Sequence, residues 1–189
     1  MNEGKLVIKI ERERLLLRNF EPTDWEDMLE ISQQYEQTDM AQYDQEYPQT
    51  PEGMKEVVEI LGSGDEFAAV VLKNHAKVIG LIQFQRKEKY VDEVVHGFGA
   101  VFNSDFQGKG YAFESSKTAL EYLFEELGID RCIAGTAVVN TKSRKLTERL
   151  GFREVIQKQV HFRNDSTGNP INFPYVVYEL SREEWESVR

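Results

Sequence analysis

The glycine-rich segment Gln107-Gly108-Lys109-Gly110-Tyr111-Ala112 constrains the fold more than any other part of the 189-residue chain. It lies between an apolar run that ends near Phe102 and a long helical pattern, so the sequence predicts a turn from a strand into a helix. Two glycines and a small alanine let the backbone approach a ligand closely, and consecutive free N–H groups converge with the positive end of the helix dipole. These features predict a diphosphate site, to which Lys109 would add a point charge.

Two familiar phosphate-binding patterns do not fit this turn. The Walker pattern requires Ser or Thr after Gly-Lys, and here Lys109 is followed by Gly110. The dinucleotide fingerprint requires Gly or Ala at the position that Phe113 occupies. The remaining functional interpretation is a turn that binds an acyl coenzyme A, beside the simpler one that the glycines only allow tight turning.

Apolar periodicity divides the chain into strands and helices. Thr50 followed by Pro51 predicts a helix that ends at Gly62, because Thr caps well and Pro fits the first turn. Thr23 and Glu26 have the spacing of a capping box, which predicts an earlier helix. Further predicted strands cover residues 15–18, 67–72, 78–84, 94–102, 132–138, 155–162 and 175–180, and further helices cover 110–127 and 141–150. This order indicates one α+β domain over residues 1–189 with a mixed sheet.

The charge balance limits the partners that suit this chain. With 23 Lys and Arg against 33 Asp and Glu, the formal net charge is -10, which repels nucleic acid and attracts a cationic acceptor. Cys132 is the only cysteine, so no internal disulfide forms and the reducing cytoplasm is the expected location. Residues 1–10 alternate charged and apolar side chains, and we expect neither a signal peptide nor contact with a membrane.

Five ordered motifs resemble those of the GNAT acetyltransferases. Gln107-x-x-Gly110-x-Ala112 is similar to the family's (Arg/Gln)-x-x-Gly-x-(Gly/Ala) turn, and Asn140-x-x-Ser143, followed by Leu150-Gly151-Phe152, is similar to its Asn-x-x-Ser helix. Three shorter pieces agree: Leu15-Leu16-Leu17-Arg18, Ile79-Gly80 and Glu183-Glu184-Trp185. Together they resemble the branch that acetylates the amino termini of ribosomal proteins, over nearly the whole chain.

The resemblance implies a central mixed, mostly antiparallel sheet of about seven strands flanked by helices, with acetyl-CoA as the cofactor. In the family, the strand before the turn leaves its neighbour, so the backbone of Ala100, Val101 and Phe102 is implied to pair with the pantetheine arm. Asn140 is implied to contact the pantetheine or the thioester, and Ser143 to donate a proton to the departing thiolate. Both residues also suit the start of a helix without any ligand.

The chain departs from the family pattern at both positions expected for acid and base. Thr147 stands where many members have a tyrosine acid, which leaves Ser143 as the better candidate. Gly97 stands where members often have a glutamate base, which leaves His96 and Glu93 as the nearest titratable groups. The three histidines lack ligand spacing, so no metal site is predicted.

The reaction implied by the resemblance is direct attack of an amine on acetyl-CoA. The acceptor stays open between a protein amino terminus, a polyamine and an aminoglycoside-like amine, and the acidic and aromatic stretch from Tyr35 to Tyr47 is implied to wall its site. Relatives in this branch often pair, which leaves room for a homodimer. The missing acid and base keep a second hypothesis open, a catalytically idle acyl-CoA sensor, and a nucleotide-binding module is the third.

Overall fold

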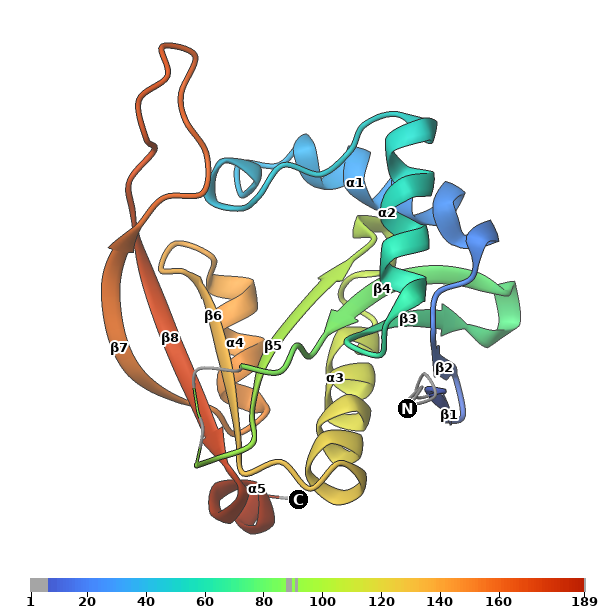
Figure 1. The fold of residues 1–189 in the computed structure, drawn as a ribbon, viewed down its shortest axis with the longest axis vertical. Coiled ribbons are helices and arrows are strands. Elements are labelled where there is room, and N and C mark those ends of the chain that lie inside the picture. The colour runs from blue at the N-terminus through green and yellow to red at the C-terminus, as the bar shows by residue number, and fades with distance from the viewer. Residues whose placement is uncertain (1–6, 88–89, 91, 189) are drawn as a thin grey trace.

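The computed structural model describes residues 7–87, 90 and 92–188, which form an eight-stranded sheet in the order β1-β2-β3-β4-β5-β6-β8-β7 (Figure 1). All neighbouring strands pair antiparallel except β5 and β6, which are parallel. The strands are β1 (Lys9–Glu11), β2 (Leu15–Arg18), β3 (Phe67–Leu72), β4 (Lys77–Gln83), β5 (Val95–Phe102), β6 (Arg131–Ala137), β7 (Arg153–Val160) and β8 (Phe173–Ser181). The predicted mixed, mostly antiparallel sheet is confirmed, with β1 as an additional strand.

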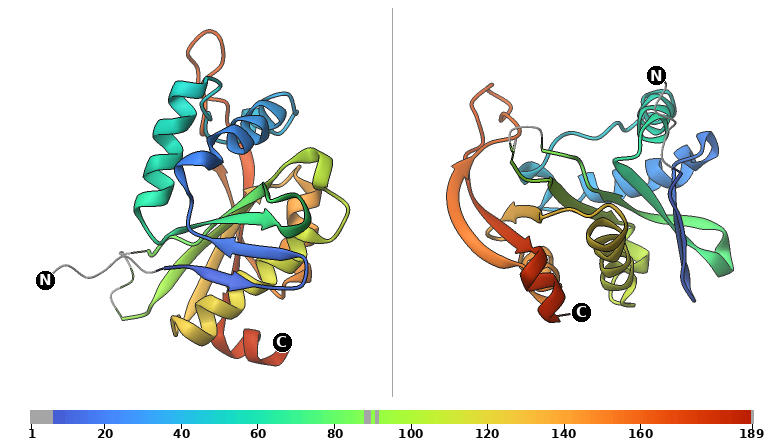
Figure 2. Two further views of the ribbon diagram at one scale, coloured as in Figure 1. Left: turned by 90° about the vertical axis from the view of Figure 1, so that its right-hand side faces the viewer. Right: turned by 60° about the horizontal axis from the view of Figure 1, so that its bottom comes forward.

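Helices cover both faces of this sheet (Figure 2). On one face lie α1 (Trp25–Glu36) and α2 (Pro51–Ser63), and on the other α3 (Tyr111–Glu121) and α4 (Thr141–Arg149), while α5 (Arg182–Val188) follows β8. Single turns of 3-10 helix occur at Pro22–Asp24, Ala41–Tyr43, Lys73–His75 and Ser104–Phe106, and a π-helix at Tyr122–Glu126 continues α3. Within the described ranges, no helix combines the length and apolar character needed to cross a membrane.

Each face of the sheet packs against its own apolar core. The core under α1 and α2 includes Met54 and Val58 from α2 and Val71 from β3. The core under α3 includes Leu120 from α3 and Val70 from β3. Because neighbouring residues of a strand point to opposite faces, Val70 and Val71 enter different cores. The same alternation decides below which side chains of β5 reach which half of the site.

The predicted start of α2 is confirmed; the earlier predicted helix is present as α1, but its predicted capping box is wrong. Thr50 caps α2, since its hydroxyl accepts from the Gly53 amide at 3.3 Å. The capping box before α1 is not formed by Thr23 and Glu26 but by Glu21 and Asp24, around the 3-10 turn at Pro22–Asp24. The fixed φ of Pro22 favours the first helical position, so the turn begins two residues earlier than the Thr23 pattern suggested.

Other element boundaries also differ from the sequence prediction. The strand expected at 155–162 lies at Arg153–Val160, and the helix expected to run to residue 127 changes into the π-helix after Glu121. The short strand β1 and the helix α5 were not predicted. β1 is three residues of largely exposed, partly charged chain, which gives no apolar period to read.

Candidate active site

The glycine-rich turn adopts a backbone that favours glycine at two positions. Gly108 and Gly110 have φ angles of 75° and 83°, in the left-handed region. The turn is anchored by the fully buried Asn103, whose side chain accepts from the Asp105 amide at 3.0 Å and donates to Glu30 at 2.8 Å. α3 begins directly after Gly110, so the predicted passage from strand to turn to helix is confirmed.

The amides of this turn have no internal use. Among the described residues, the N–H groups from Gly108 to Phe113 have no hydrogen-bond acceptor, and the first amide bonded to the turn is that of Glu114, which donates to Gly110 O at 3.0 Å. Residues 107–110 are exposed. A run of free donors therefore meets the positive end of the α3 dipole, which is the arrangement that binds phosphate groups. The residues present fit the diphosphate of coenzyme A.

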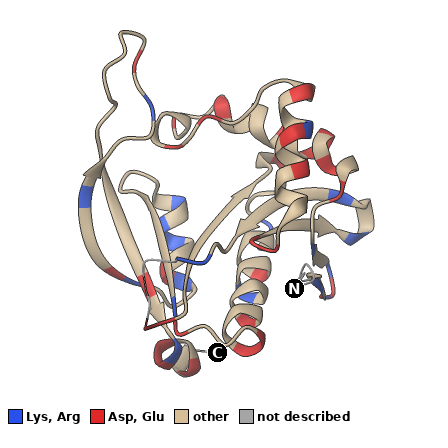
Figure 3. Cartoon of the chain, in the orientation of Figure 1, with Lys and Arg blue, Asp and Glu red and all other residues tan. Residues whose placement is uncertain are grey.

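Basic side chains stand beside the turn in spite of the chain's net negative charge. Lys109 donates to the carbonyl of Asp105 at 3.0 Å, and Lys142 at the start of α4 donates to Gln107 Oε1 at 3.3 Å. Figure 3 shows further Lys and Arg on α4. Lys142 was not among the predicted site residues, although its signal is visible in the sequence: α4 carries Lys142, Arg144, Lys145 and Arg149 against a single acidic residue, Glu148.

Strands β5 and β6 part in the middle of the sheet. Their parallel pairing runs from Val95 opposite Arg131 to Phe98 opposite Ala134 and then stops. β5 continues on β4, with Gly99 opposite Gln83 and Phe102 opposite Gly80, whereas β6 continues on β8. The opening between the two ribbons is seen in Figure 1, and we call the end of their pairing the fork. One backbone edge of residues 99–102 is thus free to pair with an extended ligand, as an added strand would.

Asn140 and Ser143 begin α4 on the β6 side of the fork. Asn140 Oδ1 accepts from the Ser143 amide at 3.1 Å, so Asn140 caps the helix. Both side chains are half-buried, and the Ser143 hydroxyl makes no hydrogen bond to a described residue. Asn140 therefore has a structural role that needs no ligand, while Ser143 keeps a free donor.

Neither candidate base lies on the free part of β5: His96 belongs to its paired part, and Glu93 precedes the strand. His96 Nδ1 lies 2.6 Å from Phe84 O, and His96 is an even-numbered residue of β5, like Phe98 and Phe102, which pack against the α3 core. Glu93 precedes β5 and pairs with Arg131 at the opposite end of the strand from the turn. Neither residue lines the cavity described next.

A cavity of about 300 Å³ lies on the other face of β5, between α1, α2 and the segment that joins them. Its apolar walls are Met28, Ile31, Met54, Val57, Leu61, Phe67, Leu81 and Val101, and its polar walls are Ser32, Tyr35, Asp44, Gln45, Tyr47, Gln83 and Gln85. Val101 places the cavity beside the free part of β5. Of the acidic and aromatic stretch implied to wall an acceptor, Tyr35, Asp44 and Tyr47 line this space.

Asp44 is the one charged side chain among the described residues that line the cavity. Its Oδ2 accepts from the Tyr35 hydroxyl at 3.0 Å, and its Oδ1 accepts from the Gln45 amide at 2.8 Å. Burial, followed by the charge of Asp44, raises the pKa of Tyr35 and of Tyr47, so both phenols stay protonated beside this carboxylate.

Arg163, from the connection between β7 and β8, fastens the segment that joins α1 to α2, residues 37–49, which we call the wall segment. Its guanidinium donates to both Glu36 carboxylate oxygens at 2.8 and 2.6 Å, to Asp44 O at 2.7 Å and to Gln45 O at 2.6 Å. The Arg163 side chain is only 12% exposed. Two segments about 120 residues apart in sequence are thereby joined at Asp44 and Gln45, which line the cavity.

The comparisons with known proteins agree with this geometry. Residues 14–153 match the acetyltransferase (GNAT) domain family. This chain belongs to the GNAT acetyltransferases. The uncharacterized N-acetyltransferase YnaD of Bacillus subtilis (strain 168) is 34% identical over 177 residues, covering 93% of this chain and 98% of the relative. The predicted family, and with it an acetyltransferase, is confirmed, and acetyl-CoA is the cofactor that this family uses.

Solved GNAT structures share the fold. An acetyltransferase (GNAT family) from Bacillus anthracis superposes with a TM-score of 0.77 at 29% identity, covering 93% of this chain and 99% of that one. The ribosomal-protein-S5-alanine acetyltransferase from Vibrio fischeri superposes with a TM-score of 0.74 at 19% identity, covering 94% and 98%. At the latter identity the likeness shows the fold alone.

The described part of this GNAT chain offers neither a metal site nor a reactive thiol. No cluster of three or more His, Cys, Asp or Glu side chains there is placed to hold a metal ion. Cys132 is fully buried in β6, and burial raises the pKa of its thiol, so little nucleophilic thiolate is present.

Proposed function

We propose that this GNAT acetyltransferase transfers the acetyl group of acetyl-CoA to a primary amine, by direct attack within a ternary complex. The observation that carries the proposal is a run of available backbone groups in the described part of the chain: amides without an acceptor at Gly108–Phe113, and a β5 edge at residues 99–102 that β6 does not pair, where the Gln107 side chain reaches Phe102 O at 3.5 Å. This track suits a ligand with a diphosphate at one end and an extended amide-containing arm at the other.

Each predicted cofactor residue takes a role along this track. Within the predicted turn from Gln107 to Ala112, the amides from Gly108 onward hold the diphosphate, since the Gln107 amide donates to Ser104 O at 3.3 Å, and Lys109 and Lys142 add positive charge. The backbone of Ala100, Val101 and Phe102 pairs with the pantetheine arm, while Asn140 borders the arm from the α4 side. Bound acetyl-CoA supplies an activated thioester carbonyl at the fork.

The amine reaches the fork from the cavity on the α1 and α2 face. Val101 belongs both to the cavity wall and to the free part of β5, so the two half-sites meet there. Holding the amine against the carbonyl supplies most of the rate enhancement. Ser143 has a free hydroxyl and is our first candidate for donating a proton to the departing thiolate. Neither His96 nor Glu93 borders this path, and we assign the removal of the amine proton to water.

A catalytically idle acyl-CoA sensor is the second candidate function. The observation that favours it is the absence of the two family side chains, with Thr147 and Gly97 at the positions of the acid and the base. Such a sensor binds acetyl-CoA as tightly as an enzyme does, but no amine accelerates its release of free thiol.

Calorimetry and a thiol-release assay separate these functions. We expect calorimetry to show binding of acetyl-CoA and much weaker binding of adenosine 5′-diphosphate. We expect amines to accelerate thiol release in a saturable way. Ser143→Ala is expected to slow turnover with little change in acetyl-CoA binding. Tight binding with no amine-dependent release selects the sensor, and absence of binding refutes both functions.

A further inference from the structure

The cavity beside Val101 narrows the class of amine. It is at the lower end of the range for small-ligand sites, on the order of 300–1,000 Å³. Eight of its fifteen wall residues are apolar, and the wall offers a single carboxylate, Asp44. An aminoglycoside or a polyamine brings several cations, of which this wall pairs one, and each buried charge without a counter-charge is costly.

We infer that the acceptor is a small primary amine with one cationic nitrogen on an apolar body, such as an arylalkylamine. The inference rests on the proposed function and specifies its substrate. Asp44 accepts hydrogen bonds from the ammonium group, and the apolar body lies among Met54, Val57 and Leu61 of α2. An Ala or Ser amino terminus would leave most of this apolar wall unfilled.

A panel of amines in the thiol-release assay tests the inference. Phenethylamine is expected to exceed spermidine, an aminoglycoside and peptides that begin with Ala or Ser by about tenfold or more in kcat/KM, since a desolvated apolar body contributes about that much. A faster reaction with spermidine, the aminoglycoside or the peptides refutes this inference and leaves the proposed function standing. No acceleration by any amine, with acetyl-CoA bound, is instead the failure of the proposed function.

Two variants test the roles of the wall directly. Asp44→Asn is expected to lower kcat/KM for phenethylamine by about ten- to hundredfold, because it removes a charge-assisted hydrogen bond. Glu46→Gln is the matched control, since Glu46 is exposed and does not line the cavity. Val57→Phe is expected to shift the preference from phenethylamine to propylamine. Equal kcat/KM values for phenethylamine in Asp44→Asn and Glu46→Gln, or an unchanged amine preference in Val57→Phe, contradict the inference.

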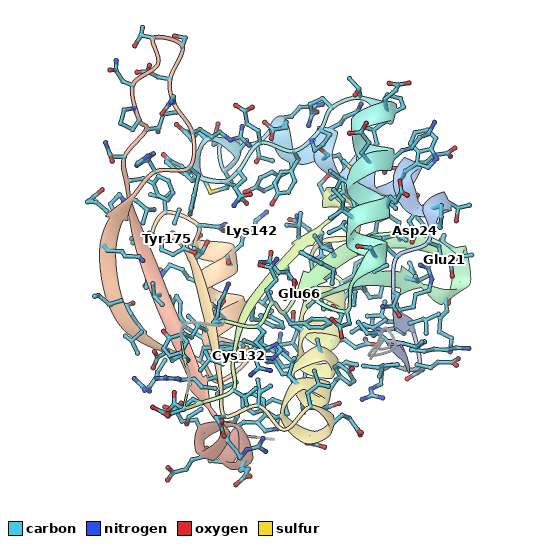
Figure 4. All side chains as sticks on the ribbon, in the orientation of Figure 1. Glu21, Asp24, Glu66, Cys132, Lys142 and Tyr175 are labelled. Atoms are coloured by element: carbon cyan, nitrogen blue, oxygen red, sulfur yellow. The ribbon has the colours of Figure 1, made fainter. Side chains whose placement is uncertain are left out.

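A second, independent observation concerns Tyr175 of β8. A Cβ atom built on Gly135 would lie 2.4 Å from the Tyr175 hydroxyl and 2.6 Å from Cζ, so the phenol lies directly over Gly135. Gly135 is the residue after Ala134, where β5 and β6 stop pairing. Figure 4 shows Tyr175 on the inner side of β8, toward the opening. The Tyr175 hydroxyl makes no hydrogen bond to a described residue.

The geometry points to Tyr175, in place of Ser143, as the proton donor to the departing thiolate, in the role that Thr147 cannot fill, and the Ser143 hydroxyl then donates only a hydrogen bond to the same sulfur. The amine nitrogen lone pair forms the C–N bond, the C–S bond breaks with its electron pair on sulfur, and the Tyr175 proton passes to that sulfur. The proton that the nitrogen loses to water returns through solvent to the phenolate. Burial, with the charge of Asp44, raises the pKa of Tyr175, so the hydroxyl carries its proton at neutral pH.

Tyr175→Phe keeps the ring over Gly135 and removes only the donor. We expect kcat to fall by about a hundredfold, the lower end of the effect of a general acid, with KM for the amine changed by less than about twofold. Tyr178→Phe is the control, because Tyr178 lies on the same strand with its hydroxyl bonded to Arg144 and Glu148 at 3.0 Å on the other face. A kcat within twofold of wild type in Tyr175→Phe, or a loss confined to the amine KM, overturns the assignment.

Discussion

Arg163 offers the sharpest test of how the acceptor half is held together. Replacing it with Met keeps most of the side-chain length but removes two hydrogen bonds to the Glu36 carboxylate and two to wall-segment carbonyls. The affected chain carries no regular structure beyond the 3-10 turn at Ala41–Tyr43, so it can open without unfolding the sheet.

The size of the effect follows from these contacts. Removing one partner of a buried ion pair costs about 3–5 kcal/mol, and an exposed pair about 0–1 kcal/mol. Arg163 and Glu36 are 12% and 22% exposed, which places the loss between these limits, at about 2 kcal/mol. That free energy corresponds to about a 30-fold change in the ratio of closed to open wall, and KM for the amine rises by up to that factor.

The assay compares two binding events in the same protein. For Arg163→Met we expect a higher amine KM and faster proteolytic cleavage within residues 37–49, with a calorimetric Kd for acetyl-CoA within about twofold of wild type. Arg153→Met is the matched control: Arg153 also pairs with two carboxylates, Glu184 and Glu179, but is 56% exposed and lies on β7 away from the cavity. An unchanged amine KM and cleavage rate in Arg163→Met would refute the reasoning, and so would equal effects of the two variants.

Three further predictions concern ionisation and stability. The hydrogen bond from Arg163 lowers the pKa of Glu36 below its ordinary value of 4.5. The Glu36 carboxylate therefore stabilises the closed wall fully above pH 4.5, and this stabilisation is lost as the pH falls through the lowered pKa. Proteolytic cleavage of the wall segment should rise over that pH range in wild type but not in Arg163→Met. Asp24→Ala leaves Arg18, 18% exposed, without its bonds of 2.7 and 2.8 Å, and should lower the free energy of unfolding in urea by about 3 kcal/mol, whereas a loss below about 1 kcal/mol would show the pair to be solvated. Cys132 should react with iodoacetamide only as fast as the protein unfolds, and rapid labelling of the native protein, read by mass spectrometry, would contradict its burial.

Local sequence signals predicted the parts of the fold that local physics decides. Thr50 and Pro51 set the start of α2, and the two glycines of the turn matched two left-handed residues, because capping and positive φ depend on a few adjacent residues. The start of α1 was missed since Glu21 and Asp24 form the less common acidic version of the capping box.

The face of the sheet on which His96 lies follows from strand alternation. Residues of one strand alternate between faces, so His96 lies on the same face as Phe98 and Phe102. Val101 lies on the opposite face. Because residues 96 and 101 are an odd number of positions apart, the His96 side chain lies on the face of β5 opposite the cavity that Val101 lines. The cavity could not be derived this way, because its walls come from residues 28 to 101, brought together only by packing.

The proposed cofactor half and the proposed acceptor half constrain the sequence differently, which explains why local motifs point to the cofactor half and not to the acceptor half. The cofactor half consists mainly of backbone groups, and only the residues that permit its conformation, Gly108 and Gly110, are constrained. The acceptor half consists of side chains, and Asp44, Val57 and Arg163 act through charge, volume and hydrogen bonding that many sequences on the same fold can change. Substitutions at the glycines should therefore act on acetyl-CoA binding through backbone strain, and substitutions on the wall should change which amine is acetylated while leaving the cofactor half intact.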